Sequence, residues 1–259
     1  MLYYPVQIPY ILNREFSQNI IYTEEIIKQV QGFVICFWEM QPRGAQKTSV
    51  ENIIISDACI DLVASYDEKR IGFSGMSKTH FHFKLDLPAR FMGARLKPGA
   101  FQQLTGLPAS AVMDSFLPIQ DVFNDFDSEM FFSLSFEQAK EYFKGYFSAL
   151  TRNKTPERFV TLFDELSQSP PCTTTELYQK LHFSPKQCQR LFAKHYGLSP
   201  KMALSIIRFQ KCLEILTSDE ATPSDILNMA GYYDQSHFIK DFKKNIGVTP
   251  LELIHTYQK

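Results

Sequence analysis

The stretch FAKHYGLSP at residues 192–200 returns fifty residues later as FKKNIGVTP at residues 242–250. Both copies follow the pattern F-x-K-x-x-G-[LV]-[ST]-P, and a self-match at a fixed offset indicates a repeated structural unit. The glycine can adopt the left-handed backbone conformation that often ends a helix. The Ser or Thr can cap the next helix, and the proline fits the first position of that helix. In the second copy Glu252 follows Thr249 by three residues, which completes a capping box. Each copy therefore predicts a helix, a stop and the start of another helix.

A short helix and a tight turn are expected upstream of each copy. In the first unit a helix over residues 176–181 is followed by Ser184, which caps a second helix with Gln187 three residues beyond the cap. In the second unit a helix over residues 226–230 is followed by Asp234, which caps the next helix. A short helix, a turn of about three or four residues and a second helix make a helix-turn-helix. The C-terminal region is therefore predicted to be an all-α domain with two such units.

The second helix of each unit has an apolar side and a polar side. The apolar side is formed by Cys188, Leu191 and Phe192 in the first unit and by Phe238, Phe242 and Ile246 in the second. The candidate DNA-binding residues lie on or beside the polar sides: Lys186, Gln187, Gln189, Arg190, Lys194, Gln235, Ser236, His237, Lys240, Lys243 and Lys244. Arg and Lys pair with guanine and Gln with adenine, and cationic side chains also bind phosphates. Arg190 and Lys240 occupy equivalent places in the two repeats, which favours DNA contact over a role as solvated charges.

The segment between the units is predicted to be one helix over residues 201–217. Seventeen residues of α-helix span roughly 25 Å. Half-sites in successive major grooves lie about 34 Å apart. The two units are therefore expected to read two adjacent half-sites together.

The N-terminal half of the chain has a different pattern. Short β-branched or aromatic stretches, separated by polar, Gly or Pro breaks, predict strands at residues 33–39, 50–55, 60–66, 80–87 and 90–96. Several short strands in series indicate an antiparallel barrel or sandwich. From about residue 136 the apolar spacing becomes helical, with a second helix over residues 156–166 and a Pro-Pro linker over 167–173. The predicted fold is α+β, divided into a β-rich sensory or dimerisation domain (1–135), a helical linker (136–170) and the double helix-turn-helix domain (171–259).

The C-terminal region resembles the DNA-binding domain of the AraC/XylS family of bacterial regulators. Residues 230–250 (AGYYDQSHFIKDFKKNIGVTP) and 177–200 carry the resemblance. It implies sequence-specific binding of promoter DNA, with activation or repression of transcription. The residues that it implies as base-facing are Lys186, Gln189, Arg190, Ser236, His237 and Lys240. The first unit departs from the family pattern at Tyr178, where a small Ala is common, and at Cys188, where a larger aliphatic residue is common.

The N-terminal half resembles a β-rich domain of one subgroup of the same family, on residues 36–39, 56–62 and 91–101. This resemblance implies an antiparallel β-barrel or cupin-like domain that binds a small effector, dimerises, or does both. The candidate effector-binding residues are Trp38, His80 and His82. Core packing is the simpler interpretation of Trp38 in a chain with 23 Phe. Asp57 and Asp61 could form a carboxylate site, although a capped turn explains them as well.

Composition limits the remaining classes of function. Net charge is −1, and residues 155–259 hold 12 Lys and Arg against 11 Asp and Glu, so DNA contact must use locally placed cations. Five cysteines, odd in number and never in a CxxC pair, indicate reduced thiols and a cytoplasmic protein. No apolar run approaches the roughly 20 residues of a membrane span, and the N-terminus lacks the pattern of a secretion signal. We expect no membrane partner.

An enzyme is the alternative function, specifically a metal-dependent cupin-like enzyme with the helices as a regulatory appendage. His80 and His82, two residues apart on a strand, would point to one face and could begin a metal site. The sequence offers no obvious third ligand, no Gly-rich phosphate loop and no GxSxG elbow. We therefore expect no catalysis, no metal and no cofactor. The predicted function is a transcription regulator whose partners are double-stranded operator DNA and, as further candidates, RNA polymerase, a small-molecule effector and a second copy of the chain.

Overall fold

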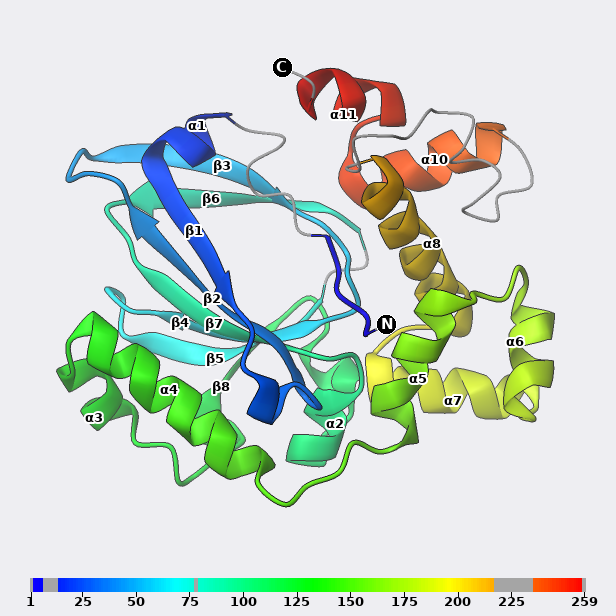
Figure 1. The fold of residues 1–259 in the computed structure, drawn as a ribbon, viewed down its shortest axis with the longest axis horizontal. Coiled ribbons are helices and arrows are strands. Elements are labelled where there is room, and N and C mark those ends of the chain that lie inside the picture. The colour runs from blue at the N-terminus through cyan, green and yellow to red at the C-terminus, as the bar shows by residue number, and fades with distance from the viewer. Residues whose placement is uncertain (1, 7–13, 77–78, 217–234, 258–259) are drawn as a thin grey trace.

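The structure is a computed structural model that describes residues 2–6, 14–76, 79–216 and 235–257. Figure 1 shows two antiparallel sheets with helices packed beside them, followed by a helical C-terminal region. The predicted α+β class is confirmed. The short helix expected at 226–230 and the cap expected at Asp234 lie outside the described residues.

The larger sheet has six strands in the order β1-β2-β7-β4-β5-β8, each pair antiparallel. Its strands are β1 (Ile20–Glu25), β2 (Val34–Pro42), β7 (Phe91–Leu96), β4 (Ile60–Ser65), β5 (Arg70–Ser74) and β8 (Phe116–Pro118). The smaller sheet pairs β3 (Thr48–Ile54) with β6 (Phe81–Leu87). Within the described strands no ladder joins the two sheets, so they face one another as an open pair instead of closing the expected barrel.

Helices α3 (Ser128–Ser133) and α4 (Phe136–Thr151) lie along the larger sheet, on the side away from β3 and β6 (Figure 1). A capping box at Ser135 starts α4, and its apolar side faces the sheet. The ring of Phe37 on β2 lies 6.1 Å from that of Phe143 and 5.8 Å from that of Phe147. The other face of this sheet is therefore left to line the space between the two sheets.

The remaining helices include the predicted C-terminal elements. They are α1 (Arg14–Asn19), α2 (Ala100–Thr105), α5 (Arg158–Gln168), α6 (Thr174–Leu181), α7 (Pro185–Tyr196), α8 (Pro200–Leu216), α10 (Gln235–Ile246) and α11 (Pro250–Tyr257). Three 3₁₀ turns are η1 (Lys28–Val30), η2 (Ala109–Val112) and η3 (Ile119–Asp121). In the part of the chain that the structure describes, no helix is both long and apolar enough to cross a bilayer.

Of the three hydrophobic clusters among the described residues, two hold the C-terminal helices, and the third packs α1 against the smaller sheet. The larger runs without a break from the six-stranded sheet through α4 and α5 into α6, α7 and the first half of α8. The smaller joins the second half of α8 to α10 and α11, and Ile55 beside β3 is its buried member from the N-terminal half. Helices α7 and α10, which contain the two copies of the repeat, are thus attached to the rest of the molecule in different ways.

Candidate DNA-binding surface and the cavity between the sheets

Helix α7 begins and ends where the repeat predicts. Ser184 is its N-cap and Pro185 its first residue. The Gln187 backbone N–H donates to Ser184 Oγ at 3.3 Å, and the Ser184 backbone N–H donates to Gln187 Oε1 at 2.9 Å, which closes a capping box. Gly197, with φ +68°, ends the helix in the left-handed region. These local bonds set the axis of α7 and therefore the direction of its exposed side.

The predicted polar side of α7 is exposed. Lys186, Gln187, Gln189, Arg190 and Lys194 are all exposed, whereas Cys188, Phe192, His195 and Tyr196 are buried. Gln187 differs from its neighbours because its amide oxygen is already engaged in the cap. Cys188, one of the departures from the family pattern, is fully buried in the larger core.

Helix α10 repeats this arrangement. Gln235, Ser236, Lys240, Lys243 and Lys244 are exposed, and Phe238, Phe242 and Ile246 are buried. His237 lies within α10, but its side chain is outside what the structure describes. The predicted cap of the next helix is present: the Thr249 backbone N–H donates to Glu252 Oε2 at 2.6 Å, and the Glu252 N–H donates to Thr249 Oγ1 at 3.3 Å.

Each exposed side carries three cations. They are Lys186, Arg190 and Lys194 on α7, and Lys240, Lys243 and Lys244 on α10. None of the six forms an ion pair with another described residue. Exposed cations that form no ion pair are available to attract phosphates and to pair with base edges.

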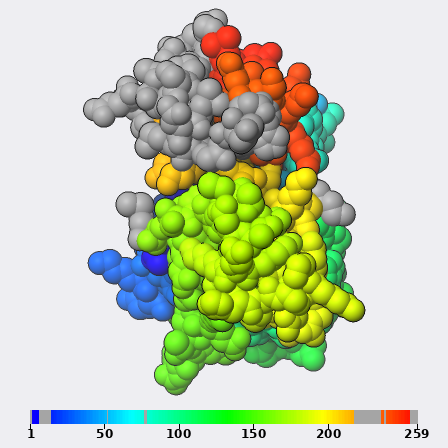
Figure 2. Space-filling model, turned by 90° about the vertical axis from the view of Figure 1, so that its right-hand side faces the viewer, coloured from blue at the N-terminus to red at the C-terminus, as the bar shows by residue number. Residues whose placement is uncertain are grey.

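Helix α8 connects the two units and holds the second. Figure 1 shows it running between α7 and α10. The Phe209 ring lies 5.3 Å from that of Phe242, and Ser205 Oγ donates to the Asp241 carboxylate at 2.8 Å. Figure 2 looks onto this side of the molecule, with the helices around α7 in its lower part and α10 and α11 at its top.

His80 lies against the second unit. Its Nδ1 is 3.0 Å from the backbone oxygen of Lys244, within the distance at which a ring N–H donates a hydrogen bond to the end of α10. A Cβ added at Gly247 would lie 2.9 Å from His80 Nε2, so the glycine also permits this close contact. His82 is exposed, with its ring 6.3 Å from that of His80. Neither histidine is among the residues that line the two pockets described below, and no cluster of three metal-ligating side chains occurs among the described residues.

A cavity of about 490 Å³ lies between the two sheets. Trp38 forms part of its wall, and the residue opposite it on β7 is Gly93. A Cβ at Gly93 would lie 2.4 Å from the indole, so only glycine leaves room for the ring. The volume falls in the range of pockets that bind small organic molecules.

One end of the cavity carries buried charge. Arg95 on β7 is 6% exposed, and its Nη1 donates to Glu24 Oε1 at 3.1 Å. Its Nε lies 3.6 Å from both Asp57 Oδ2 and Asp61 Oδ1. Trp38 Nε1 donates to Asp61 Oδ2 at 2.9 Å. Burial, which outweighs the attraction of Arg95, raises the pKa of Asp61 to about 6.

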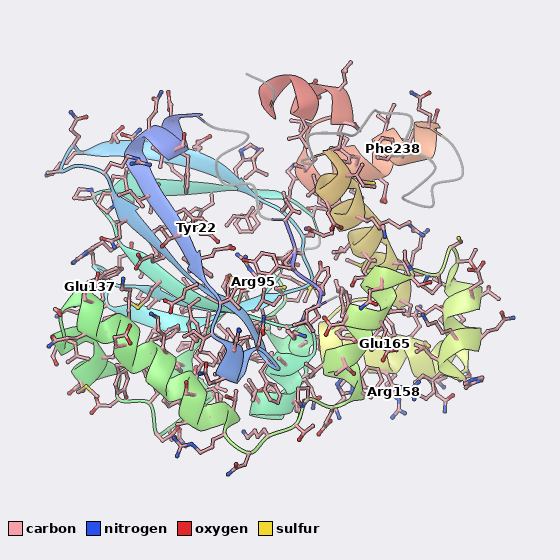
Figure 3. The ribbon with its side chains drawn as sticks, viewed as in Figure 1. Tyr22, Arg95, Glu137, Arg158, Glu165 and Phe238 are labelled. Atoms are coloured by element: carbon pink, nitrogen blue, oxygen red, sulfur yellow. The ribbon has the colours of Figure 1, made fainter. Side chains whose placement is uncertain are left out.

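Two tyrosines bind the Glu24 partner of Arg95, and one of them, Tyr22, also lines the cavity. The hydroxyls of Tyr4 and Tyr22 both donate to the Glu24 carboxylate. Figure 3 labels Tyr22 and Arg95, which come from β1 and β7 and lie close together between the sheets. Neither Arg95 nor Glu24 is among the residues that the sequence pattern predicted for a site. A charged residue inside the apolar strand RFMGARL was the signal that could have identified Arg95 as a buried, paired cation.

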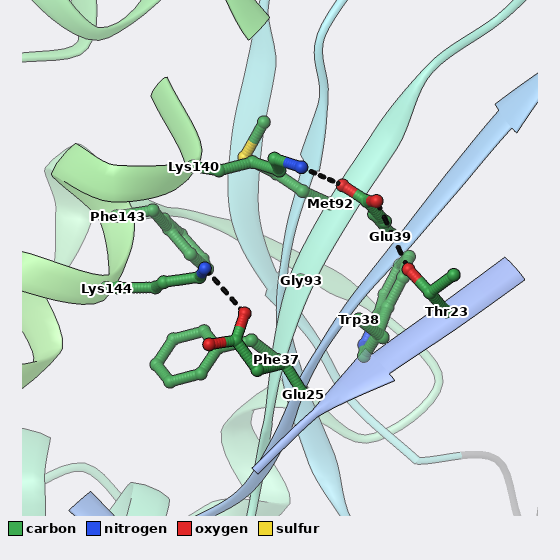
Figure 4. Close-up of a pocket in the computed structure, with 10 residues that line it drawn as sticks. All are labelled: Thr23, Glu25, Phe37, Trp38, Glu39, Met92, Gly93, Lys140, Phe143 and Lys144. Carbon is green, nitrogen blue, oxygen red and sulfur yellow. Dashed lines mark hydrogen bonds and ion pairs between the residues drawn. The ribbon is translucent and has the colours of Figure 1, made fainter. Parts of the chain in front are cut away.

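A second, smaller pocket lies on the other face of the large sheet. It measures about 60 Å³ and lies under α4 (Figure 4). Lys140 Nζ lies 2.7 Å from Glu39 Oε2, and Lys144 Nζ lies 2.6 Å from Glu25 Oε2. These ion pairs attach α4 to the sheet, and the pocket is too small for an organic effector.

Comparison with known proteins divides the chain in the same way. Residues 177–255 match a family described as a helix-turn-helix domain, and residues 27–118 match a domain of unknown function, DUF6597. The raffinose operon transcriptional regulatory protein RafR of Pediococcus pentosaceus is 30% identical over 99 residues, which are 38% of this chain and 36% of RafR. The lactose operon transcription activator of Staphylococcus xylosus is 28% identical over 85 residues, or 33% of this chain and 30% of that protein.

These alignments span about a third of each relative's length. Both relatives are transcription regulators, so the similarity favours a regulator over the alternative of a metal-dependent enzyme. Among solved structures, the C-terminal domain of AraT, a response regulator from Geobacillus stearothermophilus, is 32% identical and covers 37% of this chain and 78% of its own, with a TM-score of 0.33. ToxT from Vibrio cholerae O395 is 11% identical and covers 82% of this chain and 97% of its own, with a TM-score of 0.41.

Proposed function

We propose that the chain is a sequence-specific transcription regulator of the AraC/XylS type, on the premise that residues 177–255 match the helix-turn-helix domain family. It reads two adjacent half-sites, one with α7 and one with α10. The observation that carries the proposal is the pair of exposed cationic sides on helices that occupy equivalent places in the two repeats. Base contacts from such helices in the major groove give specificity, and phosphate contacts give position.

The proposed contacts differ by position along each helix. Base edges are read by Lys186, Gln189 and Arg190 in the first half-site and by Ser236, His237 and Lys240 in the second. Phosphates are bound by Lys194, Lys243 and Lys244, which lie in the last turns of α7 and α10. Gln187 and Gln235 lie at the helix starts, and Gln187 offers only its amide nitrogen because its oxygen is used in the cap.

Capture of genomic fragments by the purified protein at about 150 mM salt tests this function, because that salt weakens non-specific phosphate binding. We expect one motif with two half-sites about one helical turn apart. The double variant Arg190→Ala/Lys240→Ala should lose the enrichment. Lys154→Ala is the matched control, since this exposed lysine follows α4 and lies outside both units. Enrichment that survives the double variant contradicts the proposed base contacts.

We further propose that the N-terminal region controls DNA binding through the cavity. Ile53 and Ile55 line the cavity and also pack in the smaller core against Phe209 and Phe238. An occupant that moves β3 therefore acts on the core that positions α10. The division into a sensory or dimerisation domain (1–135), a linker (136–170) and a DNA-binding domain (171–259) belongs to this proposal.

The remaining partners are also proposals. A regulator of this type acts in the cytoplasm on promoter DNA, where RNA polymerase is the second partner that it needs. Two copies bound to one operator would pair through the N-terminal region. Sedimentation of the full chain across concentrations tests pairing, and a single monomer mass at every concentration would contradict it.

A further inference from the structure

The cavity between the sheets has the walls of a site for an organic molecule. Besides Trp38 and Tyr22, its apolar lining includes Phe16, Met40, Ile53, Phe83, Leu85 and Phe91. These side chains come from both sheets and from α1. Aromatic rings stack on apolar groups and also attract cations through their faces.

Among the described residues, the buried end of the cavity carries more negative than positive charge. Three carboxylates, those of Glu24, Asp57 and Asp61, surround the one guanidinium of Arg95. With all four ionised, their net charge is −2. A further buried negative charge is costly beside these carboxylates, so a ligand that brings a positive charge is favoured here over a ligand that brings another carboxylate.

The arrangement is also incomplete in its hydrogen bonds. Arg95 Nε is buried and has no hydrogen-bond partner among the described residues. It lies between Asp57 Oδ2 and Asp61 Oδ1 but is 3.6 Å from each, beyond the usual length of an N–H···O bond. A buried donor left without an acceptor indicates a polar group that is supplied from elsewhere. The acceptor that fits here is a hydroxyl or carbonyl oxygen.

From this geometry we propose that the cavity binds an organic cation. This ligand has an apolar body, a protonated amine, and a hydroxyl or carbonyl oxygen beside the amine. The amine donates to the carboxylates of Asp61 and Asp57, the oxygen accepts from Arg95 Nε, and the body packs among the aromatic walls. The proposal rests on the proposed function, because it names the class of effector that the regulator senses.

Four compounds with the same phenylpropyl body test the class. They are phenylalaninol (amine and hydroxyl), 3-phenylpropan-1-amine, 3-phenylpropan-1-ol and 3-phenylpropanoate. Binding to the full chain is measured by calorimetry at pH 7.5 and by fluorescence of Trp38, which is the chain's one tryptophan and lines the cavity. We expect saturable binding of phenylalaninol below about 1 mM, weaker binding of the plain amine, and at least tenfold weaker binding of the alcohol and the carboxylate.

Two variants locate the binding site. Asp61→Asn keeps an oxygen for Trp38 Nε1 but removes the charge, so both amines should bind at least tenfold more weakly, with little change for the alcohol. Asp86→Asn is the matched control, because Asp86 also lines the cavity but is an exposed residue of β6. This variant should change amine binding less than threefold. Thermal unfolding of each variant checks that the fold is kept.

Three results would overturn the proposal: a carboxylate or alcohol that binds as tightly as phenylalaninol, no binding of either amine up to about 5 mM, or amine binding that survives Asp61→Asn unchanged. The capture of DNA fragments is measured separately on the same protein. Specific DNA binding without a preference for amines refutes the ligand class alone, whereas amine binding without a DNA motif refutes the proposed function.

Discussion

The two helix-turn-helix units share a sequence pattern but differ in what holds them. In the first, Tyr196 Oη donates to the backbone oxygen of Phe159 at 2.7 Å, and the His195 ring stacks on the Phe159 ring at 4.0 Å. This unit belongs to the core that runs into the six-stranded sheet. In the second, Phe238 and Phe242 pack on α8 in the smaller core.

The difference shows that two copies of one sequence motif can pack in two different hydrophobic cores. The first unit shares one continuous core with the N-terminal sheet, so the two are expected to unfold together. The second unit depends on α8, with Ile55 and His80 as contacts from the N-terminal half. We therefore expect the second unit to be the one that opens locally and that the N-terminal region can reposition.

The largest effect is expected from removing the equivalent phenylalanine of each unit. Phe192 and Phe242 are both fully buried, and truncation of such a side chain costs about 3–5 kcal/mol. Phe192→Ala should lower the unfolding temperature of the whole protein. Phe242→Ala should leave the main transition nearly unchanged and speed amide exchange in α10 and α11 only, as hydrogen-exchange mass spectrometry can show. Equal loss of global stability in the two variants would remove the proposed difference.

A pH effect should be present in the first unit alone. Burial, together with the nearby Lys194 charge, lowers the pKa of His195 from 6.5 to about 4, whereas the equivalent residue of the second unit is Asn245. Between those values the unfolded chain binds more protons than the folded chain. Neutral His195 therefore makes its full contribution to the free energy of unfolding above pH 6.5. This contribution, up to about 3 kcal/mol, is lost as the pH falls through about 4.

The variant His195→Asn copies the residue of the second unit and should remove this pH dependence. Urea unfolding at several pH values between 4 and 7 measures the effect on both proteins. If the free energy of unfolding of the wild type falls no faster than that of the variant below pH 6.5, protonation of His195 does not destabilise the fold and the prediction is wrong.

Single substitutions on the exposed sides compare how the units read DNA. Arg190→Ala and Lys240→Ala should each weaken specific binding by about 1–3 kcal/mol and relax preference within one half-site only. Binding to a library with each half-site randomised in turn makes the comparison. A uniform loss on every sequence would assign the side chain to phosphate instead of a base.

The smallest effect is expected at the helix ends. Lys194→Ala and Lys244→Ala should weaken binding by less than tenfold on all sequences and reduce the slope of log affinity against log salt by about one. Titrations at several salt concentrations measure that slope. A larger effect at Lys194 than at Lys244 would indicate that the more firmly held unit contributes more phosphate binding.

The sequence predicted the features that depend on neighbouring residues. The capping boxes at Ser184 and Thr249 and the helix end at Gly197 each involve residues a few positions apart, so the pattern of residue types was sufficient. The five predicted strands were also found, because alternation and turn residues are local signals. The exposed sides of α7 and α10 followed from helical spacing in the same way.

Tertiary structure decided the features that join distant residues. Strands β1, β5 and β8 were not predicted, since a short strand is stabilised by its partners more than by its own composition. The ion pair of Arg95 with Glu24 joins residues 71 positions apart. The two copies of the repeat lie in different cores because each copy is buried against whatever surface the rest of the chain presents to it. That surface is formed by residues distant in the sequence, so a local pattern cannot predict it.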